Sequence, residues 1–286
     1  MCVPEGRKQM KNEGGASKSQ EPDDVKRWLA NSDTHQTWMN AFYGDSKNQD
    51  FYEAAFDRIL DIVRPPEGAI FLDAGCGVCA HSIRLANRGF LVHAVDFSEA
   101  ALDMGRASVK ALGLEEKIRI SSGNITELPF ADESYDYVLC WGVLMHIPDL
   151  VKALTELARV LRLGGTLVVS EGNMSSSDSI LGRTLFRPLR RRKTVMKKTP
   201  AGIEYRTSTG SATRFVRFAN VNWLIRRFET EGVYIQERFS GQFTGAYTMV
   251  SFGLLKDLIH HFNMSYFNHN GDPRVASGNI LIFQKH

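Results

Sequence analysis

The chain has 286 residues, of which 43% are hydrophobic, and a formal net charge of +3. This length and composition are sufficient for one enlarged domain with a continuous hydrophobic core. No apolar stretch reaches the ~18 residues of a membrane-spanning helix, so the composition excludes an integral membrane protein, and we expect a soluble one.

The N-terminal residues 1–24 are rich in Lys, Glu, Gly, Ser and Gln and contain almost no large apolar side chain. This composition predicts a disordered tail, without the apolar centre of a secretory signal. The following stretch, from Val25 to about Asp50, is different because it is aromatic. We expect it to pack over a ligand site, with its main contributions from Trp28, Trp38, Phe42 and Tyr43.

From residue 51 onward, apolar runs that predict strands alternate with amphipathic segments that predict helices. The predicted helices are 51–63, 79–88, 98–112, 148–162 and 220–231, and the predicted strands are 69–73, 90–95, 117–121, 135–140, 165–171, 233–239 and 279–284. Strands and helices in alternation form a parallel sheet with helices on both faces. The sequence therefore predicts a Rossmann-like α/β fold.

The first predicted strand runs directly into a glycine turn that contains Gly75 and Gly77. Glycine tolerates positive φ and lets a ligand lie against the main chain, and the N-terminus of the next helix would point at that ligand. The second strand ends in Asp96, 19 residues after Gly77. An acidic side chain at this distance holds a ribose diol in nucleotide-binding folds.

Asp73, two residues before Gly75, separates two classes of ligand. A dinucleotide would bring a doubly negative pyrophosphate to this turn, and a neighbouring carboxylate would repel it. S-Adenosylmethionine instead brings an ammonium and a sulfonium, which Asp73 can pair with. The pattern Gly75-x-Gly77-x-x-Ala80 still fits a dinucleotide, so an NAD(P)-dependent oxidoreductase is the alternative hypothesis.

At this point the chain resembles the class I S-adenosylmethionine-dependent methyltransferases, particularly their small-molecule branch. The resemblance extends over residues 50–171 and includes the second strand to Ser98, the loop around Asn124, the fourth strand with its turn, and the glycine turn before strand five. It implies that the cofactor is bound by Asp73, Gly75, Gly77, Asp96, Phe97, Asn124, Ile125 and Cys140. Two positions depart from the family pattern: Cys79 replaces a third glycine, and Asn124 replaces an Asp that receives the adenine amino group.

The resemblance also implies a seven-stranded sheet whose last strand is antiparallel and lies between strands five and six. We interpret residues 25–286 as a single domain, with a core formed by 50–171, 220–239 and 279–286. Two insertions, 172–219 and 240–278, follow the carboxyl ends of strands, where open α/β sheets bind their substrates. We expect them to form a cap or lid over the substrate.

Three of the four cysteines, Cys76, Cys79 and Cys140, fall in the proposed cofactor loops. A disulfide framework is therefore not expected. Cys76 and Cys79 have the spacing of half a zinc site, but no second Cys pair or suitably spaced His pair completes it, so we expect no metal. The implied compartment is a reducing one, the cytoplasm.

The segment from Arg183 to Lys198 contains eight basic residues and no acidic one. A solvated, mobile face is one interpretation. Others are an anionic small-molecule acceptor, or peripheral contact of 181–198 with an acidic membrane surface, aided by Leu181, Leu185, Phe186 and Leu189. We expect no nucleic-acid partner, because the fourth strand ends in Cys140-Trp-Gly-Val rather than the polar residue, Pro-Pro and aromatic of enzymes that methylate bases.

The predicted function is methyl transfer from S-adenosylmethionine to a hydroxyl, amine or activated carbon of a small molecule. His146 follows strand four, and its imidazole is the candidate general base where the acceptor must lose a proton. In the alternative interpretation, His146 caps the helix that starts near Pro148 or hydrogen-bonds a loop. A third hypothesis is a catalytically silent, S-adenosylmethionine-binding regulatory domain.

Overall fold

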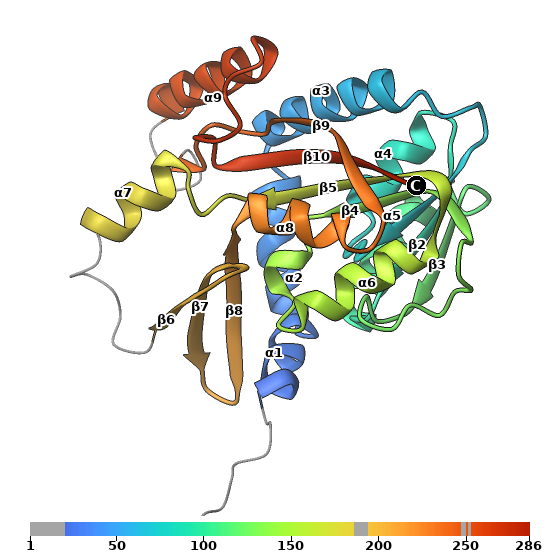
Figure 1. Cartoon of the computed structure of the whole chain (residues 1–286), viewed down its shortest axis with the longest axis horizontal. Helices are drawn as coiled ribbons and strands as arrows, with labels where there is room; N and C mark the ends of the chain where they lie inside the picture. Colours follow the sequence, from blue (N-terminus) through green and yellow to red (C-terminus); the bar gives the residue numbers. More distant parts are fainter. Residues whose placement is uncertain (1–20, 186–193, 247–249, 251–252) are drawn as a thin grey trace, which may run out of the picture.

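The computed structural model describes residues 21–185, 194–246, 250 and 253–286. Its centre is a seven-stranded sheet with the order β3-β2-β1-β4-β5-β10-β9 (Figure 1). The strands are β1 (Ile70–Ala74), β2 (Leu91–Asp96), β3 (Ile118–Ser122), β4 (Tyr135–Trp141), β5 (Leu161–Gly172), β9 (Val233–Ser240) and β10 (Gly278–Lys285). Strand β10 pairs antiparallel with β5 and β9, while β1 to β5 pair in parallel. The predicted fold class and the place of the antiparallel last strand are confirmed.

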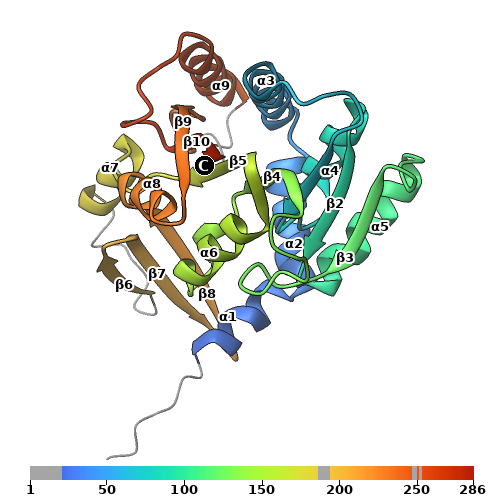
Figure 2. The same cartoon turned by 45° about the vertical axis from the view of Figure 1, so that its right-hand side comes forward.

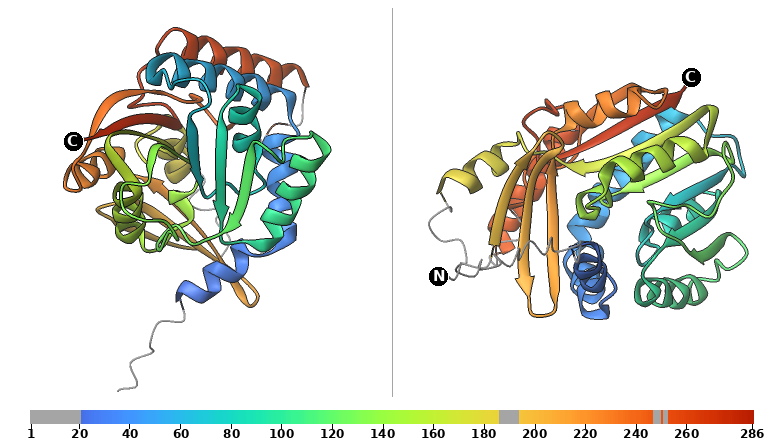
Figure 3. Two further views of the ribbon diagram at one scale, coloured as in Figure 1. Left: turned by 90° about the vertical axis from the view of Figure 1, so that its right-hand side faces the viewer. Right: turned by 60° about the horizontal axis from the view of Figure 1, so that its bottom comes forward.

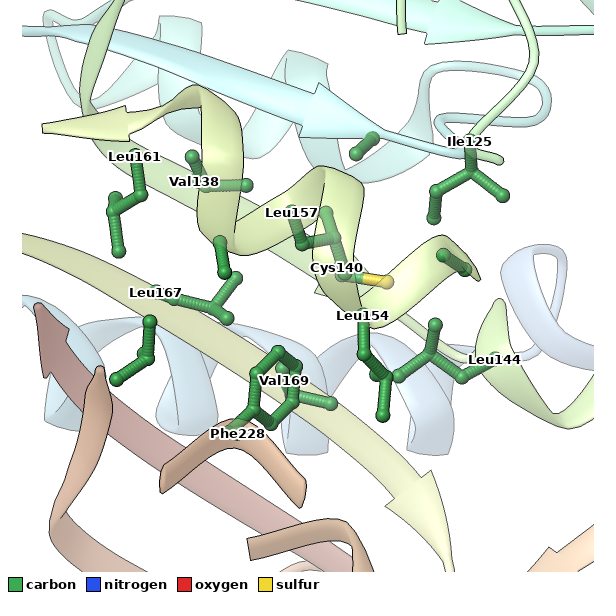
Figure 4. Close-up of a cluster of buried hydrophobic side chains, with 14 of the residues drawn as sticks. Ile125, Val138, Cys140, Leu144, Leu154, Leu157, Leu161, Leu167, Val169 and Phe228 are labelled. Atoms are coloured by element: carbon green, nitrogen blue, oxygen red, sulfur yellow. The ribbon is translucent and has the colours of Figure 1, made fainter. Parts of the chain in front are cut away.

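Helices cover both faces of this sheet, as Figure 2 shows. The helices that pack on one face are α3 (Ser46–Val63), α4 (Ala80–Asn87), α5 (Glu99–Ala111) and α9 (Gly253–Asn268); α6 (Leu150–Val160) and α8 (Val221–Glu229) pack on the other. Successive residues of a strand point to opposite faces, so the central strands contribute to two cores. In β4, Leu139 packs toward α3, and its neighbours Val138 and Cys140 pack toward α6 (Figure 4).

Helix boundaries follow capping residues in the sequence. Ser98 caps α5 by accepting a hydrogen bond from the backbone N–H of Ala101, as its position predicts. Helix α6 begins after Asp149, whose side chain accepts from the N–H of Lys152. Within the described residues, no helix has both the length and the apolar character needed to cross a bilayer.

Three further segments lie outside this α/β framework (Figure 3). The N-terminal segment forms α1 (Glu21–Leu29), α2 (Ser32–Trp38) and a π-helical turn (Met39–Tyr43). The insertion after β5 contains α7 (Ser177–Leu185) and a three-stranded antiparallel sheet of β6 (Thr194–Thr199), β7 (Gly202–Thr209) and β8 (Ala212–Ala219). The insertion after β9 contains α9.

The N-terminal helices pack against the second of these segments. Val25 and Leu29 of α1 form a small core with Phe215 of β8, and Arg27 donates a hydrogen bond to the carbonyl of Ser211. The single domain and the capping role of the insertions stay predictions. The predicted tail lies mostly outside the described residues, as do the side chains of Leu185, Phe186 and Leu189.

Candidate cofactor site

The glycine turn after β1 has the backbone conformation that its sequence predicts. Gly75 has φ +85° and Gly77 has φ +52°. The N–H groups of Gly75 and Cys76 donate to the carbonyl of Val95 at 2.7 and 3.0 Å, which joins the turn to the end of β2. A Cβ at position 75 would lie 2.5 Å from a methyl group of Val143, whereas a Cβ at position 77 would meet nothing within 4 Å. The turn is therefore tightly packed behind Gly75 and open at Gly77.

Asp96 joins this turn to the start of α5. Its Oδ2 accepts from the N–H of Gly77 at 2.9 Å, and its Oδ1 accepts from the N–H of Ser98 at 2.9 Å. Burial raises the pKa of Asp96, and these two hydrogen bonds oppose that shift. Each oxygen keeps acceptor capacity for a ribose hydroxyl.

Asp73 is a buried carboxyl with one neutral partner. Only 2% of its surface is exposed, and its Oδ2 accepts from the Ser82 hydroxyl at 2.6 Å. Burial raises its pKa to about 7, and the nearby charge of Asp96 acts in the same direction. No Lys, Arg or His of the described residues forms an ion pair with it. A cationic ligand at the glycine turn would supply the missing charge, so the donor set fits a sulfonium or ammonium group.

Cys79 replaces the family's third glycine, and its side chain is accommodated by Gly105 of α5. It adopts the left-handed conformation, with φ +62°, and is fully buried. A Cβ added to Gly105 would lie 2.6 Å from the Cys79 sulfur, so the thiol occupies the space that Gly105 leaves. The side chain packs against α5, on the protein side of the turn. Cys79 and Gly105 therefore form a complementary pair.

The other predicted cofactor residues lie in three different surroundings. Ile125 and Cys140 are buried in the core on the α6 side, so any cofactor contact by Cys140 would come from its backbone (Figure 4). Phe97 packs beside α1 and Phe215. The side-chain oxygen of Asn124 accepts a hydrogen bond from the backbone N–H of Thr126 at 3.0 Å. One further lone pair of this oxygen is therefore open to the adenine amino group.

His146 lies in a short 3₁₀ helix, Leu144–His146, after β4. Because a carbonyl only accepts, the Nδ1 of His146 is the donor of its hydrogen bond to the carbonyl of Phe215, at 3.0 Å. The imidazole also stacks on the Trp38 ring, with the ring centroids 5.1 Å apart. Burial lowers the pKa of His146 to about 4. This geometry favours a structural role for His146, with the difference that the bonded carbonyl belongs to strand β8 rather than to a loop. Such a low pKa makes it a weak general base.

The sequence reasoning missed a buried polar clamp on the loop that carries His146. Glu171, at the end of β5, accepts from the N–H of Leu144 at 2.8 Å, and burial raises the pKa of Glu171 to about 8. Arg217 of β8 donates to the carbonyls of Leu144 and Ile147, and pairs with Glu204 at 2.9 Å. Glu171 was detectable as an acidic residue at a strand end, whereas Arg217 carried no sequence signal.

Comparison with known proteins places this geometry in a family context. Residues 72–169 match the family described as "Methyltransferase domain". Demethylmenaquinone methyltransferase from Bacillus cytotoxicus is 41% identical over 128 residues, which are 44% of this chain and 51% of that protein. The chain thus spans about half the length of the curated relatives it matches.

Solved structures share the fold at low sequence identity. A S-adenosylmethionine-dependent methyltransferase from Methanosarcina mazei has a TM-score of 0.55 and 19% identity, covering 79% of this chain and 96% of that one. A geranyl diphosphate methyltransferase in complex with S-adenosylmethionine has a TM-score of 0.54 and 17% identity, covering 82% and 85%. These structures confirm the predicted fold, and the family match confirms the resemblance to methyltransferases over residues 72–169.

Proposed function

We propose that this chain, which carries a class I S-adenosylmethionine-dependent methyltransferase domain, transfers a methyl group from that cofactor to a small-molecule acceptor. The observation that carries the proposal is the buried carboxyl of Asp73, which lies beneath an open glycine turn without a cationic partner. A pyrophosphate at this turn would meet two carboxyl groups, Asp73 and Asp96, whereas a cation would be stabilised by them. This contrast also argues against the oxidoreductase alternative.

In this proposal the cofactor supplies an activated methyl group, and the chain supplies binding and orientation. Asp96 would hold the ribose, Asp73 would face the cationic end, and Gly77 would let the ligand approach the main chain. The N-terminal helices would exclude water, because in-line methyl transfer depends mainly on holding the acceptor about 3 Å from the methyl group. We propose a structural rather than a basic role for His146, whose pKa is too low for efficient proton removal.

For the acceptor we propose an apolar, aromatic small molecule. Trp28, Trp38 and Phe97 lie together beside the ribose end of the site. The curated relatives are named for demethylmenaquinone. An anionic acceptor remains the alternative, and the atom methylated, oxygen, nitrogen or carbon, is a matter for an acceptor screen.

Calorimetric titration with S-adenosylhomocysteine, run beside NADH, tests the proposal. We expect micromolar binding of the first ligand only, and loss of binding in Asp96→Ala. Asp136→Ala is the matched control, because Asp136 is an exposed carboxylate that pairs with Arg162 at the opposite end of β4. Binding of NADH, or of neither ligand, would refute the proposal. Binding without turnover of any acceptor would favour the regulatory hypothesis.

We also propose peripheral contact with an anionic membrane surface, now centred on α9. Four large apolar side chains form a stripe on its outer face and are between 48% and 78% exposed: Leu254, Leu255, Leu258 and Phe262. Ile180 and Leu181 of α7 are also exposed. Thr244, in the loop after β9, is hydrogen-bonded to both helices: its hydroxyl donates to Asp178 of α7 and its backbone N–H donates to the side chain of Asn263 of α9. Exposed apolar side chains in a chain that also carries the basic sequence 183–198 favour anionic lipid.

Sedimentation with vesicles of 70% phosphatidylcholine and 30% phosphatidylglycerol tests this contact. We expect Leu254→Ser/Leu258→Ser to lose most binding, and Leu163→Ser, which changes a leucine that is 65% exposed elsewhere, to bind normally. Equal vesicle binding of the parent and both variants would refute the proposed contact. It would also be refuted if light scattering showed that the parent is a dimer and Leu254→Ser/Leu258→Ser a monomer, with no binding of the parent to vesicles. We retain the cytoplasm as the proposed compartment, supported by the free thiols of Cys76, Cys79 and Cys140.

A further inference from the structure

His81 is a buried imidazole in the first turn of α4, directly after the glycine turn. Only 4% of its surface is exposed. Its ring stacks on Phe56, with centroids 5.2 Å apart, and three other aromatic rings lie within 5.0 to 5.6 Å: Tyr43, Tyr52 and Trp141. The aromatic enclosure, as we name these four rings, comes from α3, the N-terminal turn and the end of β4.

The hydrogen bonding of His81 fixes its tautomer. The guanidinium of Arg84 lies 3.4 Å from Nδ1, and since a guanidinium only donates, Nδ1 must accept. The neutral ring therefore carries its proton on Nε2. Burial, with a smaller contribution from the charge of Arg84, holds the pKa of His81 well below its ordinary value, so the ring stays neutral near pH 7.

The Nε2–H group of His81 has no hydrogen-bond partner among the described residues. A buried donor without an acceptor is costly, and most such groups in folded proteins have a partner. An acceptor that enters with a ligand would remove this cost.

The topology of the sheet indicates which part of a ligand would reach His81. Asp96 ends β2, and β1 lies between β2 and β4. A cofactor with its ribose at Asp96 that crosses the glycine turn must place its other end near the end of β4, where Trp141 lies. Tyr43 also borders this path: burial raises the pKa of its phenol to about 12, and the charges of Asp73 and Asp96 act in the same direction.

We propose that the Nε2–H of His81 donates a hydrogen bond to the α-carboxylate of the cofactor's methionine part. The inference rests on the proposed function, because it assumes an S-adenosyl ligand at this turn. The N-terminus of α4 adds its partial positive charge at the same place. His81 thus holds the end of the cofactor opposite to the end that Asp96 holds.

The test compares S-adenosylhomocysteine with 5′-methylthioadenosine, which lacks the amino-acid part, by calorimetry. His81→Phe keeps a ring but removes the donor, His81→Gln keeps an N–H near the Nε2 position, and His93→Phe is the control on β2. We expect His81→Phe to weaken the binding of S-adenosylhomocysteine by about 10- to 100-fold, which corresponds to the loss of a hydrogen bond to a charged group. The affinity for 5′-methylthioadenosine should change by less than about twofold in His81→Phe. His81→Gln should recover part of the lost affinity for S-adenosylhomocysteine.

Two outcomes would overturn the inference. One is an equal loss for both ligands in His81→Phe, which would mean that His81 only packs the enclosure. The other is unchanged S-adenosylhomocysteine affinity in a folded His81→Phe protein, with folding checked by thermal melting. Failure of the unsubstituted protein to bind S-adenosylhomocysteine would instead refute the proposed function, so the two failures are distinguishable.

Discussion

Exchange of the Cys79 and Gly105 side chains tests how the cofactor turn tolerates its unusual cysteine. Gly105→Ala alone places a methyl group 2.6 Å from the Cys79 sulfur. Overpacking of this kind costs about 1–3 kcal/mol, while replacing a helical glycine by alanine returns about 1 kcal/mol. We therefore expect the single variant to lose up to about 2 kcal/mol of unfolding free energy.

Cys79→Gly has two opposing effects. It removes a buried thiol, which costs about 1 kcal/mol, and it relieves a left-handed backbone, which returns about 1–2 kcal/mol. In Cys79→Gly/Gly105→Ala the new methyl group fills the space of the sulfur. We expect the double variant to be at least as stable as the parent, with a coupling free energy of about 1–3 kcal/mol between the two sites.

Urea unfolding followed by circular dichroism measures all four proteins of this cycle. The matched control combines Gly105→Ala with Cys140→Ala, because Cys140 packs in the core on the α6 side of the sheet, away from Cys79 and Gly105, and its effect should be additive. Additivity within about 0.5 kcal/mol for the Cys79 cycle would refute the reasoning. It would mean that α5 shifts to admit the methyl group, and that the two positions are not matched.

Three further predictions concern buried charges. Because burial raises the pKa of Asp73 to about 7, its folded form holds a proton that the unfolded form loses near pH 4, so ligand-free stability should fall as pH rises from 4 to 7. Urea melts of Asp73→Asn should show a smaller fall than the parent, the remainder coming from Asp96 and Glu171; the same variant should bind S-adenosylmethionine about tenfold more weakly in calorimetry. Glu171→Gln, which can still accept from Leu144, should melt like the parent near pH 4 and increasingly above it as pH rises from 4.5 to 8, whereas Glu171→Ala should lose about 1–3 kcal/mol at pH 4; equal loss in both variants would contradict this. Arg217→Ala should cost about 3–5 kcal/mol in urea melts because Glu204 is left buried and unpaired, and Arg217→Ala/Glu204→Ala should recover part of that loss.

Periodicity and glycine positions predicted the individual strands and helices, because regular helices cover both faces of the sheet. The seven-stranded sheet with an antiparallel last strand followed from the resemblance to the methyltransferase family. The predicted strand 135–140 corresponds to β4 at Tyr135–Trp141, and 233–239 corresponds to β9 at Val233–Ser240. The β6–β8 sheet was not predicted, because its strands alternate weakly and its first strand follows a basic run. Helix α9 was missed since its apolar residues lie on both faces, including the exposed one.

The predicted site depended on backbone features, and these are the parts that the geometry brings together. Gly75, Gly77, Asp73 and Asp96 meet at one turn, because the ends of adjacent parallel strands lie side by side. The roles of individual side chains were harder to predict. His146 is enclosed by Trp38, far away in the sequence, and such long-range burial sets a pKa that no local pattern reveals.

The loop 142–148 is the place where the cofactor half of the molecule meets its covering segments. Val143 packs behind Gly75, and the following residues are fastened to β8 by Arg217 and by the carbonyl of Phe215. Grafting a different segment in place of 172–219 would therefore require a substitute for these polar attachments, for the packing of Phe215 against α1 and for the hydrogen bond of Asp178 with Thr244, while β1 and β2 stay unchanged. Under the proposed capping role of 172–219, acceptor preference would change with this segment and cofactor binding with the strands, provided that an arginine at position 217 is kept.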